Sequence, residues 1–172
     1  MPSLVFALIA VIGAAVQIRR RRGPDRRELP VDTLLVWWLV TAVGVGSIVG
    51  SLFHIFDGAQ IAEQIGYTRG DGGFQFENAM GDMAIGVAAV LCRWFRGYFW
   101  LAVLIVVAIQ FLGDAGGHIY FWLAEDDTEP DNVGLTLLFD FAIPIAAAIL
   151  YTLSWRRGGD ARPEREAVAR TA

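Results

Sequence analysis

The sequence contains no lysine and a single cysteine among its 172 residues. One cysteine cannot form a disulfide within the chain, so Cys92 says nothing about the redox compartment. All 14 basic residues are arginines, and with the exception of Arg69 they gather beside apolar runs. This placement indicates membrane topology and gives no reason to expect a nucleic-acid partner. Phosphate-binding loops, nucleophile elbows and dinucleotide fingerprints are also absent, so no enzyme class defined by those motifs is indicated.

Apolar residues are abundant: 55% of the chain is hydrophobic, which is more than in an ordinary soluble domain. A helix needs about 20 apolar residues to cross the hydrocarbon core of a bilayer. Five runs approach or exceed that length and predict an all-α bundle of five transmembrane helices within residues 1–155. The predicted spans are residues 2–18, 33–56, 74–91, 98–123 and 133–155. We also expect the second helix to continue past residue 56, because apolar side chains between residues 59 and 65 recur at a helical spacing.

The arginine clusters predict the orientation of this bundle. Arginines accumulate in residues 19–27, in the turn at residues 93–96 and in the tail from residue 156. Five spans bring all three segments to one side, which is cytoplasmic by the positive-inside rule, with the N-terminus outside and the C-terminus inside. The acidic connections 57–73 and 124–132 then lie outside. A signal peptide is the alternative for the first run, but its positive charges would precede the apolar stretch instead of following it.

The expected environment of the protein follows from this topology. The lipid bilayer is the predicted partner, and a bacterial cytoplasmic membrane is the predicted location of this multi-pass protein. Residues 156–172 have few side chains to bury and are predicted to form a disordered cytoplasmic tail. A homo-oligomer or a larger membrane complex is a further expectation, because the chain is small and carries no extramembrane domain.

Ionisable side chains of the predicted spans concentrate at one depth, toward the outer side. This predicted polar layer draws seven residues from four helices: His54, Asp57, Glu77, Asp82, Asp114, His118 and Asp140. Because Gln110, Asp114 and His118 are four residues apart, they share one helix face. Gly113 and Gly117 lie beside this row as a small-xxx-small pair, which predicts close packing of the second predicted helix against it. The inner half of the spans carries almost no ionisable side chain, so we predict an outward-facing site.

Two histidines among several carboxylates suit a non-haem transition metal such as Fe, Mn, Zn or Cu. The seven residues of the polar layer are the candidate ligands. The site would be redox-active if the bound metal can change its oxidation state. Haem b is a variant of this hypothesis, with His54 and His118 as axial ligands. The Glu-x-x-His motif of di-iron bundles and the His-Glu-x-x-His motif of zinc proteases are absent. We therefore predict a metal site whose ligand set follows neither pattern.

Two other functions fit the same residues. Carboxylate and histidine side chains carry protons in pumps and transporters, which favours a small proton- or ion-coupled transporter. Alternatively, the polar side chains pair with one another and only fasten the bundle, as in a non-catalytic accessory subunit of a membrane complex. No pattern in the sequence assigns a reaction or a catalytic residue, so the sequence does not decide whether the protein is an enzyme.

Two stretches carry a family resemblance. "FHIFDGAQIAEQIGYTRGDGGFQFENAMGDMAIG", at residues 53–86, and "GDAGGHIY", at residues 113–120, resemble a family of small bacterial multi-pass membrane proteins without an assigned function. The resemblance implies a helical membrane bundle and implies no chemistry. In size and layout the chain is also loosely similar to DoxX-like membrane proteins, some of which are linked to redox complexes.

Overall fold

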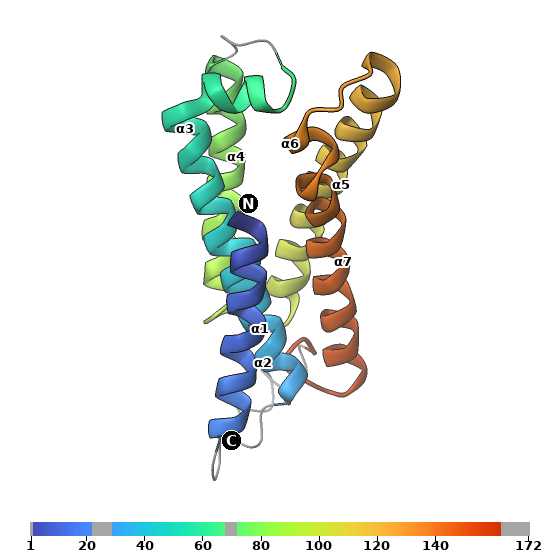
Figure 1. The fold of residues 1–172 in the computed structure, drawn as a ribbon. Helices are drawn as coiled ribbons and strands as arrows, with labels where there is room; N and C mark the ends of the chain where they lie inside the picture. The colour runs from blue at the N-terminus through green and yellow to red at the C-terminus, as the bar shows by residue number, and fades with distance from the viewer. Residues whose placement is uncertain (1, 22–28, 68–71, 163–172) are drawn as a thin grey trace.

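The computed structural model describes residues 2–21, 29–67 and 72–162. Within these ranges every regular element is a helix, which confirms the predicted all-α bundle. The helices are α1 (Pro2–Arg20), α2 (Pro30–Trp37), η2 (Trp38–Val45), α3 (Gly46–Gln64), α4 (Gly72–Leu91), α5 (Tyr98–Glu125), α6 (Pro130–Val133) and α7 (Leu135–Arg156). The long helices run side by side along a common direction (Figure 1).

Four helical stretches of the described chain are long and apolar enough to cross a membrane: Ser3–Arg20, Pro30–Gln64, Tyr98–Glu125 and Pro130–Arg156. Only 17–33% of the residues in their most apolar windows are buried inside the protein, as expected for helices that face lipid. The third predicted span corresponds to α4, which is helical but is not one of these four stretches. Its first half carries polar side chains, including Gln75 and Asp82, and these lower its apolar character.

The second span is one continuous helical segment of 35 residues made of α2, η2 and α3. It begins with Pro30 at the first helical position, where the missing N–H breaks no helical hydrogen bond. It continues to Gln64, as the amphipathic spacing predicts. Gly66 ends it with a φ of +90°, and the Tyr67 N–H donates to the Ala62 carbonyl at 2.8 Å, as in a Schellman motif.

Close helix packing occurs between η2 and α4. A Cβ atom added to Gly86 would lie 2.9 Å from the carbonyl oxygen of Gly44 and 2.7 Å from the Ile48 side chain. By contrast, a Cβ atom on Gly113 or Gly117 would meet no described neighbour within 4 Å. The prediction that these two glycines admit a neighbouring helix is therefore wrong. Small-residue spacing marks a face that can pack closely, but the partner helix must also reach that face.

Two helix pairs meet through a shared core. The α3–α4 pair and the α5–α7 pair separate toward the end that carries the α3–α4 and α5–α6 connections (Figure 1), which we call the acidic end. At the opposite end lie the last turn of α1, the turn at residues 92–97 and the end of α7 (Figure 1), and we call it the arginine-rich end. Between the two ends, Leu39 and Val43 of η2 pack with Val107 and Ile143 in the apolar core.

The chain after α7 folds back onto the bundle. Residues 156–162, the first part of the segment predicted to be disordered, pack against the arginine-rich end. The Gly159 N–H donates to the Ser154 carbonyl at 2.8 Å, and the Gly97 N–H donates to the Asp160 carbonyl at 3.1 Å. Ala161 is fully buried. Residues 163–172 of the predicted tail lie outside the described residues.

Candidate functional site

A pocket of about 670 Å³ lies at the acidic end, between the two helix pairs. One wall comes from Tyr67 and Phe74, next to the α3–α4 connection, and the opposite wall comes from Phe121 and the acidic residues 125–129. Burial, followed by the negative charges of Asp114 and Asp127, raises the pKa of the Tyr67 phenol. Asp114 therefore lies within electrostatic range of a pocket-lining side chain, which connects the pocket to the predicted polar layer.

His118 of α5 is held between two side chains from other elements. Its Nδ1 atom lies 2.6 Å from Oδ1 of Asn132, in α6. Its Nε2 atom lies 3.6 Å from Oδ2 of Asp140, in α7. Asn132 is completely buried and is itself anchored, because its Nδ2 group donates to the carbonyls of Asp127 at 2.9 Å and of His118 at 3.3 Å.

This arrangement fixes the protonation of the His118 ring at Nδ1. The Asn132 Nδ2 group faces two carbonyl oxygens, so it must be the amide nitrogen, and the atom facing His118 must be the amide oxygen. An amide oxygen only accepts hydrogen bonds, so the His118 Nδ1 atom carries a hydrogen. The Nε2 atom then either has a lone pair or a second hydrogen directed toward Asp140.

The contact between His118 Nε2 and Asp140 therefore needs one proton, bound to either group. A lone pair on His118 Nε2 facing an ionised carboxylate would be repulsive, whereas a proton on either group makes the contact attractive. The Asp140 Oδ2 atom is buried and has no hydrogen-bond partner among the described residues. With side chains only 10% and 14% exposed, water screens this pair weakly.

A second histidine belongs to the α3–α4 pair. The Nδ1 atom of His54 lies 2.6 Å from Oε1 of Gln75, and Gly58 allows this contact, because a Cβ there would lie 3.0 Å from the Gln75 Cβ. His54 thus packs against α4, while Asp114 of α5 lies within electrostatic range of its ring. Its partner is an amide, and no carboxylate bonds to the ring in the described part of the chain.

Asp82 and Asp114 lie between the two histidines. Asp82 of α4 is within electrostatic range of His54 and Asp114, and Asp114 is within range of both histidines. Asp140 is in turn within range of Asp114 and Asp82. The structure thus brings together five of the seven predicted residues from four helices, in a looser arrangement than a single hydrogen-bonded cluster.

Asp114 and His118 do not form a local ion pair. Both carboxylate oxygens of Asp114 accept from Gln110 Nε2, at 3.1 and 3.0 Å, as expected for side chains on one helix face. The remaining two predicted residues, Asp57 and Glu77, are exposed and form no hydrogen bond or ion pair with the other five in the described structure. Asp57 also interrupts α3 with a non-helical backbone (φ −133°, ψ 26°).

The predicted metal site has no three-ligand set in the described structure. No group of three His, Cys, Asp or Glu side chains in that part of the chain is arranged to hold one metal ion. Both histidines have Nδ1 facing an amide oxygen, and among the described residues His118 alone has a carboxylate oxygen, at 3.6 Å, facing its other nitrogen. The metal site therefore stays a prediction.

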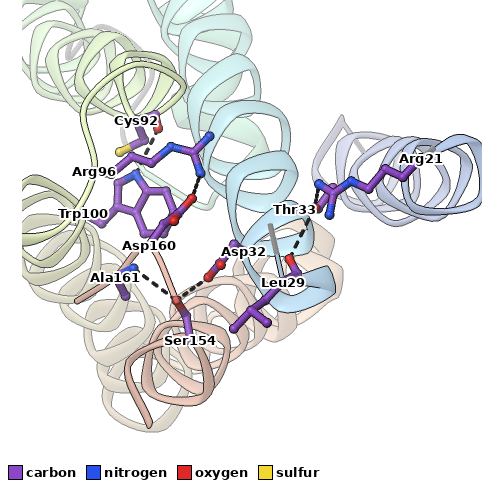
Figure 2. A network of polar contacts seen from close by, with 10 residues as sticks. All are labelled: Arg21, Leu29, Asp32, Thr33, Cys92, Arg96, Trp100, Ser154, Asp160 and Ala161. Atoms are coloured by element: carbon purple, nitrogen blue, oxygen red, sulfur yellow. Dashed lines mark hydrogen bonds and ion pairs between the residues drawn. The ribbon is translucent and has the colours of Figure 1, made fainter. Parts of the chain in front are cut away.

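Sequence reasoning missed a second polar network, at the arginine-rich end (Figure 2). Asp32 of α2 is completely buried and accepts a hydrogen bond from the Ser154 hydroxyl of α7. The same hydroxyl accepts from the Ala161 N–H at 3.1 Å. Arg96 forms an ion pair with Asp160 and lies 5.4 Å from the ring centroid of Trp100.

Little in the sequence could have revealed these partners. Asp32 precedes the apolar run of residues 33–56 by one position and reads as the acidic first turn of a helix that starts with Pro30. Asn132 ends an acidic stretch that has the composition of a solvated loop. In both cases burial depends on which element folds over the residue, and that information is not local.

Comparison with known proteins places this arrangement in a family. No curated protein and no solved structure matches the chain. The looser likeness to DoxX-like membrane proteins therefore gains no support. A family model matches residues 1–160, which is nearly the whole sequence. The chain thus belongs to DUF6790, a family of unknown function.

Proposed function

We propose that this protein is a small proton-coupled membrane transporter that takes up protons at its acidic end. The observation that carries the proposal is the His118–Asp140 contact. Asn132 fixes the hydrogen of the ring at Nδ1, so the contact with Asp140 is attractive only when one further proton is bound. Histidine and carboxylate side chains within membrane spans are the groups that proton carriers use.

The surroundings of this pair support uptake from one side. The acidic pocket lies next to it, since Asp127 lines the pocket and its carbonyl holds Asn132. Carboxylates around a concave entrance raise the local concentration of cations. Toward the arginine-rich end, the apolar core around Val43, Val107 and Ile143 blocks a proton path from the layer. The arrangement corresponds to a state that is open at the acidic end and closed at the arginine-rich end.

A transition metal is a weaker proposal for the same layer, because no three-ligand set forms in the described part of the chain. A purely structural layer is the remaining alternative. It accounts for the Gln75 and Asn132 contacts but gives no reason for a buried Asp140 oxygen without a hydrogen-bond partner in the described chain.

Proton flux into liposomes tests the proposal. Purified protein is reconstituted with a pH-sensitive dye inside the vesicles, and a pH gradient and a potential are imposed. We expect flux above that of protein-free vesicles, loss of this flux in Asp140→Asn, and normal flux in Glu77→Gln. Glu77 is a matched control because it lies in α4, the helix that carries Asp82, but is exposed and forms no hydrogen bond or ion pair with the cluster in the described structure. Wild-type flux equal to that of empty vesicles, or equal flux in the two variants, would refute the proposal.

A further inference from the structure

A second pocket, of about 230 Å³, lies at the arginine-rich end. Its lining residues come from α1, α2, η2 and the turn between α4 and α5, whereas His118, Asn132 and Asp140 lie in α5, α6 and α7. Its wall has two chemically different parts. Arg93 and Arg96 provide one part, while Val36, Trp37 and Val40 provide an apolar part.

Arg93 is the side chain of this pocket that most needs a partner. It is exposed, and it makes no hydrogen bond or ion pair with any described residue. Arg96, three residues further along the same short connection, is already engaged by Asp160 and the Trp100 ring (Figure 2). These contacts hold the turn in place, so the position of Arg93 is set by a rigid support.

Polar groups of the opposite wall are also fixed. Thr33 lines the pocket, and its hydroxyl accepts a hydrogen bond from Arg21, the residue directly after α1 (Figure 2). The indole Nε1 of Trp37 donates to Gln17 Oε1 at 2.6 Å, which leaves the ring face as an apolar surface of the pocket. On the other wall, the guanidinium groups of Arg93 and Arg96 suit a phosphate group, which accepts several charge-assisted hydrogen bonds.

We propose that this pocket binds the headgroup of an anionic phospholipid. A volume of about 230 Å³ equals roughly eight water molecules at about 30 Å³ each, which is enough for a phosphate and a glycerol unit but not for acyl chains. The acyl chains would leave over Val36 and Val40, which lie in a helix long and apolar enough to span the membrane. This apolar exit favours a lipid over a soluble phosphate ester. Basic pockets beside membrane helices are suited to such headgroups.

The test measures lipid binding to the full-length protein by native mass spectrometry in detergent, with phosphatidylglycerol and phosphatidylcholine as probes. We expect preferential binding of phosphatidylglycerol and about a tenfold loss of affinity for it in Arg93→Gln, because a charge-assisted hydrogen bond is removed. Arg156→Gln is the matched control. It removes the same charge from an exposed position in the last turn of α7, outside the pocket, and should leave the affinity unchanged.

Two results would overturn the inference. Equal affinities of Arg93→Gln and Arg156→Gln for phosphatidylglycerol would show that only net charge attracts the lipid. Displacement of the lipid by glycerol 3-phosphate at millimolar concentration would show that the pocket takes a soluble phosphate ester. Neither result bears on proton flux, so the inference and the proposed function stand or fall separately.

Discussion

Removal of one hydroxyl group at the arginine-rich end should open that end of the bundle. Ser154 donates to the buried Asp32 carboxylate and accepts from the Ala161 N–H. The other oxygen of Asp32, Oδ2, already has no hydrogen-bond partner among the described residues. Ser154→Ala would therefore leave a completely buried carboxylate without a partner there, and would also remove the acceptor of the Ala161 N–H.

The size of the effect follows from these two losses. A hydrogen bond to a charged group contributes about 1.5–3 kcal/mol, and an unsatisfied buried N–H costs about 1–3 kcal/mol. Partial relaxation and entry of water reduce the sum, so we expect about 3 kcal/mol. Since each 1.4 kcal/mol is about a factor of ten, the equilibrium constant for local opening should rise roughly 100-fold.

Cys92 provides the assay, because it is the single cysteine of the chain and lies beside this network. Its carbonyl accepts from Trp100 Nε1 at 2.9 Å (Figure 2). Burial raises the pKa of the Cys92 thiol to about 12. The thiolate is the reactive form, so the folded protein should resist a maleimide at neutral pH and react only after opening.

We expect the labelling rate of Ser154→Ala to exceed that of the wild type roughly 100-fold, in proportion to the opening equilibrium. Thr152→Ala is the control, because this exposed hydroxyl donates only to the Ala148 carbonyl of its own helix, at 2.8 Å, in the described structure. Its labelling rate should match the wild type. If Ser154→Ala is labelled as slowly as Thr152→Ala, the buried network does not hold this end together and the reasoning fails.

Two further predictions concern helix packing and metal content. Gly86→Ala should destabilise the protein by about 1–3 kcal/mol, because its Cβ would lie 2.9 Å from the backbone oxygen of Gly44. Gly81→Ala, in the same helix and with no described neighbour within 4 Å, should be neutral or stabilising, and equal thermal stabilities of the two variants would contradict the packing. Protein purified without chelator should contain no stoichiometric Fe, Mn, Zn or Cu and show no Soret band, because no three-ligand set forms in the described chain. One bound metal per chain that is lost in His118→Ala would overturn that expectation.

More of the fold than of its side-chain contacts could be predicted from the sequence. Run lengths and arginine positions predict the long helices and the amphipathic end of α3, because the length of a membrane helix is set by bilayer thickness. The same signals predict α4 as a span, but it is not among the stretches of the described chain that are apolar enough to cross a membrane, because one half of it is polar. The predicted orientation, with the N-terminus outside, stays a prediction.

The candidate site shows where sequence reasoning stops. The depth of the polar residues in their helices could be predicted, and five of the seven lie within electrostatic range of one another. Their partners could not be predicted, because the helix-surface pattern does not say which helix packs on which face. Gln75 and Asn132, the amides that hold the two histidines, come from a polar helix start and an acidic connection. Neither had a periodicity that marked it as buried.

Nitrogen NMR of the histidines tests the central claim most directly, because the chain contains only two of them. In protein labelled with ¹⁵N-histidine and placed in lipid bilayers, His54→Gln assigns the remaining signal to His118. We predict that Nδ1 of His118 carries the hydrogen that faces Asn132 Oδ1, and that Asp140→Asn changes the Nε2 signal, because the carboxylate facing Nε2 is replaced. A His118 with its hydrogen on Nε2 and a bare Nδ1, or an Nε2 signal unchanged in Asp140→Asn, would contradict the account.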